Sequence, residues 1–352
     1  MLKQTTRKTE SSSIIWNNLE AIVRMKVREF IQGLLEAEVE DLLGRQKSER
    51  RKLVDSPPVY RNGYGKERKL TLGNGTITLQ RPRVRGLEER FQSQVLPLFA
   101  RRTPALNQLL PQLYLHGLAL GDFDLALRGL LGKEAPISAG TIARLKEKWQ
   151  IEWQEWRQRS LVGLEVVYCW ADGIYVKAGL EKNKAALLVV IGGLSNGQKV
   201  VLAVEPGYRE SIESWSSILR DLKSRGMNQP RLVVGDGNLG LWGALSNVYP
   251  GTGEQRWRMV TFYQFPQEHW VHLRTTNIVE SPFAGLRLRT AASKRYKKVE
   301  NATAVIWKML LVAEQRFRRL NAPEKLQQVF QGTEFPDGIE VKNKAEEVLA
   351  LA

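Results

Sequence analysis

The stretch Leu164-Glu-Val-Val-Tyr-Cys-Trp-Ala-Asp-Gly-Ile-Tyr-Val-Lys-Ala178 predicts a buried β-strand that carries an aspartate, Asp172, toward its end. Apolar and aromatic residues run throughout the stretch, as expected for a β-strand. The segments after it indicate to which kind of sheet it belongs.

Two more strands are expected, at residues 184–193 and 199–205, with Ser195-Asn-Gly-Gln198 as the turn between them. They are followed by a helix, a short buried strand and another helix, at residues 210–225, 231–236 and 239–248. Three hairpin-connected strands, a helix, a strand and a helix are typical of a ribonuclease-H-like core. That core is a mixed α/β sheet with a carboxylate on its first and fourth strands.

Three separated acids are candidates for a metal site. Asp172 and Asp236 lie at strand ends, and Glu280 lies near the start of a predicted helix in Arg274-Thr-Thr-Asn-Ile-Val-Glu-Ser-Pro-Phe-Ala-Gly-Leu-Arg-Leu-Arg-Thr290. Phosphoryl transfer on DNA uses two divalent metals roughly 3.5–4 Å apart, and Mg²⁺ prefers carboxylates and water as ligands. Asp172 could bridge both ions while Asp236 and Glu280 each hold one. The nucleophile would be water for strand nicking and a DNA 3′-hydroxyl for strand joining.

Each acid also has a purely structural interpretation. Asp172 and Asp236 both precede glycine, and Asp-Gly is a common turn dipeptide. Glu280 follows Asn277 by three residues, which is the spacing of a capping box at a helix start. The joint placement of the three acids on this strand order is what favours a site.

The composition favours a polyanionic partner. The 352 residues include 53 Lys plus Arg and 37 Asp plus Glu, a formal net charge of +16. Phosphate binding gains from counterion release, so DNA is the expected partner. No apolar run approaches the roughly 18 residues of a membrane span, and the N-terminus does not lead into the apolar core of a signal peptide. With Cys169 as the only cysteine, we expect no disulfide, no thiolate zinc cluster, no membrane partner and a cytoplasmic, nucleoid-associated location.

The N-terminal half reads as mainly helical with a small β-hairpin. Residues 15–45 predict a helix with a solvated acidic face, residues 46–68 a loop, and residues 69–81 a hairpin that turns at Gly73-Asn-Gly75. Helical patterning returns over 104–158, where two helices joined by a short turn fit a helix-turn-helix. A plain helical bundle with a basic face is the alternative.

The expected domains are an N-terminal helical region (1–60), a β-hairpin segment (61–100), a helix-turn-helix-like region (101–160), a ribonuclease-H-like catalytic domain (161–320) and a C-terminal tail (321–352).

The segment 287–319 contains ten Lys and Arg residues and only two acids, Glu300 and Glu314. This excess of positive charge favours phosphate-backbone contact over a solvated face. The expected DNA-binding residues are Arg144, Lys146, Lys148, Arg274, Asn277, Arg287, Arg289, Lys294, Arg295, Lys297 and Lys298.

Two other groups of reactive residues have simpler explanations. Cys169, in the strand of Asp172, is expected to be a small packing residue and not a nucleophile. Glu268, His269 and His272 could form a metal site, but the neighbouring proline and aromatic residues favour a docking loop.

The chain resembles the Mutator-type transposases of bacterial insertion sequences over nearly its whole length. The resemblance is strongest in Asp172-Gly-Ile-Tyr-Val-Lys, in Asp236-Gly and in the block Phe262-Tyr-Gln-Phe-Pro-Gln-Glu-His-Trp-Val-His-Leu-Arg-Thr-Thr-Asn-Ile-Val-Glu280. It implies a DDE transposase with a ribonuclease-H-like catalytic domain and the triad Asp172, Asp236 and Glu280. It also implies Mg²⁺ as the cofactor, with Mn²⁺ as the alternative ion, terminal inverted repeats and target DNA as partners, and a homo-oligomer.

The sequence departs from the family pattern in one place. Family members carry a long helical insertion between the second acid and the glutamate, which begins after a Gln-Arg-Cys strand. Here Glu254-Gln-Arg256 runs directly into Trp257, and only 44 residues separate Asp236 from Glu280. An internal deletion after about residue 256 would remove the last strand of the sheet or much of it.

We therefore expect a weakly active or inactive transposase, because a catalytic group misplaced by about 1 Å can cost on the order of a hundredfold in rate. The alternative is a DNA-binding transposition inhibitor without catalysis. A cellular ribonuclease-H-like nuclease has little support beyond the fold.

Overall fold

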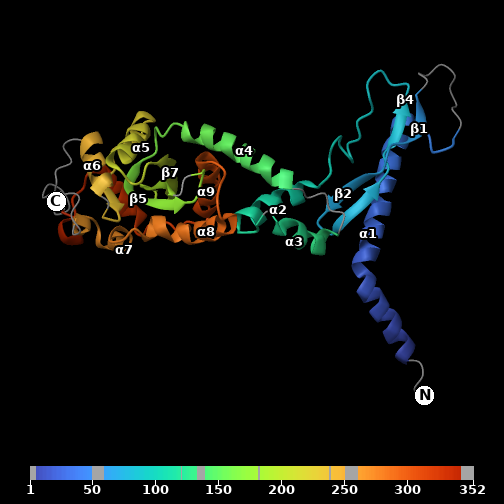
Figure 1. The fold of residues 1–352 in the computed structure, drawn as a ribbon, viewed down its shortest axis with the longest axis horizontal. Coiled ribbons are helices and arrows are strands. Elements are labelled where there is room, and N and C mark those ends of the chain that lie inside the picture. Colours follow the sequence, from blue (N-terminus) through green and yellow to red (C-terminus); the bar gives the residue numbers. More distant parts are fainter. Residues whose placement is uncertain are drawn as a thin grey trace, which may run out of the picture. The chain divides into compact units, whose positions relative to one another are not determined.

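The structure is a computed structural model that describes residues 5–49, 59–119, 121–132, 139–180, 183–237, 239–249 and 261–341. The chain divides into two compact units (Figure 1). The first comprises residues 1–114 and 118–142, and the second comprises residues 115–117 and 143–352. The division falls inside a helix and not at residue 160, where the sequence suggested it. None of the described helices is both long and apolar enough to cross a membrane.

The first unit is built from a long helix and a hairpin. Helix α1 (Thr5–Leu43) packs on the hairpin of β2 (Arg68–Leu72) and β3 (Gly75–Leu79), which are antiparallel as expected. Their small core contains Leu35 of α1 and, from the hairpin and the segment after it, Leu70, Ile77, Leu79 and Leu96. The Gln32 side chain exchanges two hydrogen bonds with the backbone of Gln80, which fixes the helix against the end of β3.

A second strand pair in this unit was not expected. Strand β1 (Tyr60–Tyr64) lies in the predicted loop 46–68 and pairs with β4 (Pro82–Arg85). The acidic face of α1, expected to be solvated, holds this region: Arg61 of β1 forms an ion pair with Glu36, and Glu38 accepts hydrogen bonds from Ser93 and Gln94. The expectation of a loop at 46–68 was wrong for β1, because its Arg61 has a partner on α1, which is distant in the sequence.

Three helices connect the hairpins to the large sheet: α2 (Pro104–Leu115), α3 (Asp122–Leu131) and α4 (Ala139–Arg157). The turn between α3 and α4, with its expected cap at Ser138, lies outside the described residues. Most of α4 belongs to the second unit, where Trp153 is buried and donates to the Val204 carbonyl at 3.2 Å. Arg157 pairs with Glu205 at 2.8 Å. The C-terminal half of α4 is therefore anchored to the sheet, and the helix-turn-helix expected from α3 and α4 stays a prediction.

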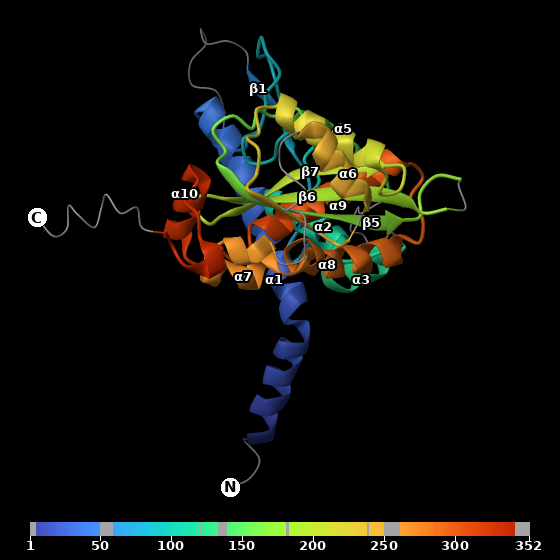
Figure 2. The same ribbon diagram turned by 90° about the vertical axis from the view of Figure 1, so that its left-hand side faces the viewer.

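The second unit contains the expected sheet. Its strands are β5 (Val166–Val176), β6 (Ala185–Leu194), β7 (Lys199–Gly207) and β8 (Leu232–Gly235), in the order β7-β6-β5-β8. The first three are antiparallel neighbours, and β8 is parallel to β5. Helices α5 (Ile212–Ser224) and α6 (Leu239–Val248) cover one face, and α7 (Trp270–Leu273) and α8 (Asn277–Ser293) lie on the other (Figure 2).

Alternation along β5 separates these two faces. Cys169 and Ala171 join the buried cluster beneath α5 and α6. Tyr168 and Trp170 point the other way, where the Tyr168 hydroxyl lies 2.8 Å from His269 Nδ1 and Trp170 donates to the His272 carbonyl at 3.0 Å. Asp172 has the same parity as Tyr168 and Trp170, so it belongs to the face that carries α8.

The chain ends with further structure on this unit. Helix α9 (Val299–Glu314) packs on β7, and α10 (Pro323–Gln331) lies in the expected C-terminal tail. Leu326 and Val329 of α10 are buried, so the described part of the tail belongs to the core of the unit. Short 3-10 turns at Thr261–Gln264, Gln267–His269 and Pro336–Gly338 complete it.

Candidate active site

Asp172 and Asp236 emerge side by side from neighbouring strands. The parallel register of β5 and β8 ends at the pair Ala171 and Gly235; Asp172 is the next residue of β5, and Asp236 directly follows the end of β8. Neighbouring parallel strands present successive residues at the same edge of a sheet. The sequence placed both acids at strand ends, which holds for Asp236, whereas Asp172 lies inside β5, four residues before its end. The pairing of the two strands still places the acids next to one another.

The Asp-Gly turn interpretation holds for one aspartate only. Gly237 follows β8 with a positive φ of 56°, and its N–H donates to the Gly235 carbonyl at 3.0 Å, as in a tight turn. Asp172 and Gly173 are instead paired with Val189 and Leu188 inside β5. Gly173 is therefore not a turn residue, and its contacts suggest another reason for a glycine at this position.

Gly173 makes room for a fourth acid that sequence reasoning missed. A Cβ at this glycine would lie 2.5 Å from the Glu210 carboxylate oxygen Oε1. The Tyr175 hydroxyl donates to the same oxygen at 2.9 Å and holds the carboxylate in place. Glu210 precedes α5 by two residues, at a loop position without a local sequence signal.

The environment of Asp172 disfavours its charged form. Burial raises its pKa to about 6, and the carboxylates of Glu210, Glu280 and Asp236 act in the same direction. The Gly173 N–H, which donates to Asp172 at 2.7 Å, opposes the shift. All the acids that matter to the site therefore lie within electrostatic reach of Asp172.

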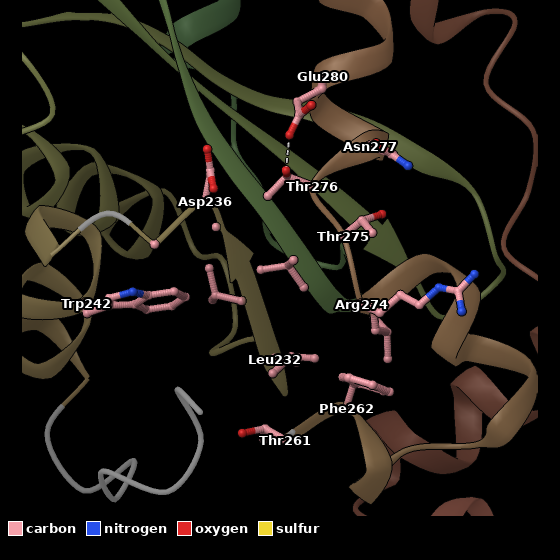
Figure 3. Close-up of a pocket in the computed structure, with 15 residues that line it drawn as sticks. Leu232, Asp236, Trp242, Thr261, Phe262, Arg274, Thr275, Thr276, Asn277 and Glu280 are labelled. Carbon is pink, nitrogen blue, oxygen red and sulfur yellow. Dashed lines mark hydrogen bonds between the residues drawn. The ribbon is translucent and has the colours of Figure 1, made fainter. Parts of the chain in front are cut away.

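Glu280 lies in the first turn of α8, which begins at Asn277, so the N-cap residue is Thr276 and not Asn277 as the capping-box interpretation required. Its carboxylate accepts a hydrogen bond from the Thr276 hydroxyl (Figure 3). Asp236, Glu280, Arg274 and Asn277 all line one cavity of about 600 Å³. Two of the three expected acids thus share a cavity, and Asp172 is not among its lining residues.

The same cavity extends along all four residues of β8. Among the described residues, β8 pairs only with β5, so its other edge faces this cavity. The junction Glu254–Trp257, where the deletion was expected, lies outside the described residues.

The donor chemistry suits Mg²⁺ or Mn²⁺, since all the side chains are hard oxygen ligands. The arrangement fits less well. Within the described ranges, no group of three His, Cys, Asp or Glu side chains lies close enough together to hold a metal ion. The Glu280 carboxylate is engaged with Thr276. The structure thus brings the acids to one region of the sheet without forming a ready set of ligands.

The segment before α8 is a docking loop, as the sequence favoured. His269 is fully buried, and its Nε2 lies 3.2 Å from the Ala322 carbonyl while Nδ1 faces the Tyr168 hydroxyl. Burial lowers the pKa of His269, which favours the neutral ring that such a pair of hydrogen bonds requires. Glu268 pairs with Lys325 at 2.5 Å. Cys169 is also buried, which raises its thiol pKa to about 12, in agreement with a packing residue.

The expected DNA-binding residues divide into two groups. Exposed side chains belong to Arg144, Lys148, Arg274, Asn277, Arg287, Lys294, Arg295, Lys297 and Lys298, and Lys146 is half-buried. Arg289 is the exception, because it is 1% exposed and donates to the Ser293 hydroxyl at 2.9 Å. Helical periodicity turns Arg289 inward from α8, so the structure does not place it among the surface cations.

Comparison with known proteins identifies the family. The model of the Mutator family of transposases matches residues 2–260. This chain belongs to the Mutator family of transposases. Asp172 and Asp236 lie within the matched residues, and Glu280 lies beyond them.

Two relatives of the Mutator-family chain are insertion-sequence transposases. The transposase of IS6120 from Mycolicibacterium smegmatis is 36% identical over 296 residues, covering 66% of this chain and 92% of that protein. The transposase of IST2 from Acidithiobacillus ferrooxidans is 33% identical over 279 residues, covering 61% and 94%. Each alignment is longer than the number of residues of this chain that it includes, because 66% and 61% of 352 residues are fewer than 296 and 279. Parts of both relatives therefore have no counterpart in this chain.

Among solved structures, the catalytic domain of the Mos1 mariner transposase aligns with 56% of this chain and 94% of its own length. Its sequence identity is 13% and its TM-score is 0.16. The fold assignment rests on the strand order and not on this likeness.

Proposed function

We propose that the chain is a DDE transposase of an insertion sequence, which binds terminal inverted repeats and target DNA. Its activity would be metal-dependent DNA cleavage and strand transfer, with Asp172, Asp236 and Glu280 as the catalytic carboxylates. The observation that carries the proposal is the placement of Asp172 on β5 next to Asp236, which directly follows the neighbouring parallel strand β8. The insertion-sequence transposases among its relatives support it.

The three carboxylates would have different roles in metal binding, because their surroundings differ. Bound Mg²⁺ or Mn²⁺ would activate the attacking oxygen and stabilise the leaving one. Asp172, half-buried among other acids, would gain most from a divalent ion, because the ion would relieve the like-charge repulsion on its carboxylate. Asp236 is exposed and free to turn toward a ligand, whereas Glu280 would first have to leave Thr276.

We further propose that an internal deletion weakens this activity. Both alignments leave parts of the relatives unmatched, and only 44 residues separate Asp236 from Glu280. A segment missing beside β8 would have packed where the cavity now separates that strand from α8. Without this support, Glu280 would be held loosely relative to the two aspartates.

A DNA-cleavage assay with a matched binding assay tests the proposal. The chain and its Asp236→Asn variant would be incubated with a DNA fragment carrying the terminal repeats of the element, in Mg²⁺ or Mn²⁺. Equal binding, with slow nicking that the substitution abolishes, would support a transposase. Equal binding without nicking by either protein would point to a transposition inhibitor, and failure to bind the repeats in preference to scrambled DNA would contradict both.

A further inference from the structure

A second groove, of about 700 Å³, begins at the residue after Asp172. One wall is the end of β5, Gly173 to Lys177, and the other is the C-terminal half of α8, with Arg287, Thr290 and Lys294. Lys184, just before β6, also lines it. The lining holds four cations and no acid, in contrast to the cavity beside β8.

Backbone hydrogen bonds hold the two sides of this groove together. The Tyr296 N–H donates to the Lys177 carbonyl at 2.8 Å, and the Gly179 N–H donates to the Tyr296 carbonyl at 3.0 Å. The Arg295 side chain adds a third link, to the Gly179 carbonyl at 2.9 Å. The segment after α8 is thereby attached to the segment after β5, so the groove does not depend on side-chain contacts alone.

The four cations have no acidic partner in the described part of the chain. The side chains of Lys177, Lys184, Arg287 and Lys294 are exposed and take part in no hydrogen bond or ion pair among the described residues. The +16 chain has cations in excess, but here four of them converge on one concave surface beside a candidate catalytic acid. Such a surface offers several phosphate contacts at once.

We propose that this groove binds the sugar-phosphate backbone of the DNA strand that enters the active site, with Lys177 and Lys184 as contacts alongside Arg287 and Lys294. The inference rests on the proposed transposase function, which supplies DNA as the substrate. A DNA strand bound in the groove would contact Gly173, which is adjacent in sequence to Asp172. The arrangement fits an extended polyanion better than a single phosphate, because the cations lie on both walls.

Salt-dependent DNA binding tests the groove. Lys177→Ala, Lys184→Ala and the double variant would be compared with Arg220→Ala, an exposed control on α5 outside the groove, by fluorescence anisotropy with duplex DNA that carries the terminal repeats. Each lysine contact removed should make the plot of log K against log salt shallower by about 0.9 and weaken binding roughly 10-fold at 0.1 M salt. Arg220→Ala should keep the wild-type slope.

A footprint on the unaltered protein gives an independent result. Amine acetylation followed by mass spectrometry should show Lys177 and Lys184 protected by DNA, and Lys223 of α5 equally modified with and without DNA. Wild-type slopes in the double variant, or no protection at either lysine, would overturn the groove while leaving the proposed function intact. Failure of the wild-type chain to bind DNA would overturn both.

Discussion

At the scale of the residue, the surroundings of Asp172 oppose its ionisation. It is half-buried, three other carboxylates act on it, and its pKa is raised to about 6. Like charges held close together cost stability unless a cation neutralises them. This cost is what would make Asp172 responsive to divalent metal.

The raised pKa of Asp172 predicts a pH-dependent cost to stability. The folded chain binds more protons at Asp172 than the unfolded chain between the ordinary value of 3.8 and about 6, so stability falls as pH rises through that window. Asp172→Asn should therefore melt at a higher temperature than wild type above pH 6 in EDTA, and the difference should shrink toward pH 4. Differential scanning fluorimetry across pH checks this.

Divalent metal should reduce this difference in melting temperature between the wild type and Asp172→Asn. Mg²⁺ or Mn²⁺ at neutral pH should raise the melting temperature of the wild type more than that of Asp172→Asn, since the metal relieves repulsion only where the charge exists. Equal shifts in the two proteins would argue against Asp172 as a ligand.

The hydrogen bond between Tyr168 and His269 should contribute measurably to stability. Tyr168→Phe leaves the buried Nδ1 of His269 without its donor, which should lower the free energy of unfolding by about 1–3 kcal/mol. Tyr175→Phe, at an exposed hydroxyl, should cost less. Urea denaturation of both variants checks the difference, and equal losses would contradict the role of His269 as an anchor of the loop before α8.

At the scale of the element, hydrophobic periodicity predicted those helices and strands whose formation depends on their own local sequence. The strands β5 to β8 and helices α5 and α6 follow from local apolar patterns and turns. Strand β1 was missed because its Arg61 is held by Glu36 of α1, and helical spacing gave no sign that Trp153 anchors α4 to β7. Glu210 was likewise missed, since long-range packing and not spacing places it. The inward position of Arg289, in contrast, follows the helical spacing of the buried residues Val279, Phe283 and Leu286, and was overlooked.

The anchoring of α4 gives a prediction about stability. Trp153→Ala empties a fully packed site and should lower the free energy of unfolding by about 3–5 kcal/mol. Ile151→Ala, on the same helix but 62% exposed, should change it by less than about 0.5 kcal/mol. Chemical denaturation followed by tryptophan fluorescence would measure both, and a small loss in Trp153→Ala would mean that α4 is not held by the sheet.

At the scale of the whole molecule, the chain combines membership of the Mutator family with acids that lie near one another on one sheet. Mutator-family residues run from 2 to 260, a net charge of +16 favours DNA, and Asp172 and Asp236 lie on adjacent strands. Yet the acids are not gathered into a ligand set among the described residues, and the relatives contain residues that this chain lacks. The account therefore predicts that DNA binding survives while catalysis suffers.

The most direct test inserts the segment that we propose has been deleted. A chimera would insert, between residues 249 and 261, the corresponding segment of the IS6120 transposase, and its strand transfer on terminal-repeat DNA would be compared with that of the chain itself. The chimera should be on the order of a hundredfold faster and should lose this activity in Asp172→Asn, Asp236→Asn or Glu280→Gln. Efficient Mg²⁺-dependent strand transfer by the chain itself, equal to that of the chimera, would contradict the account.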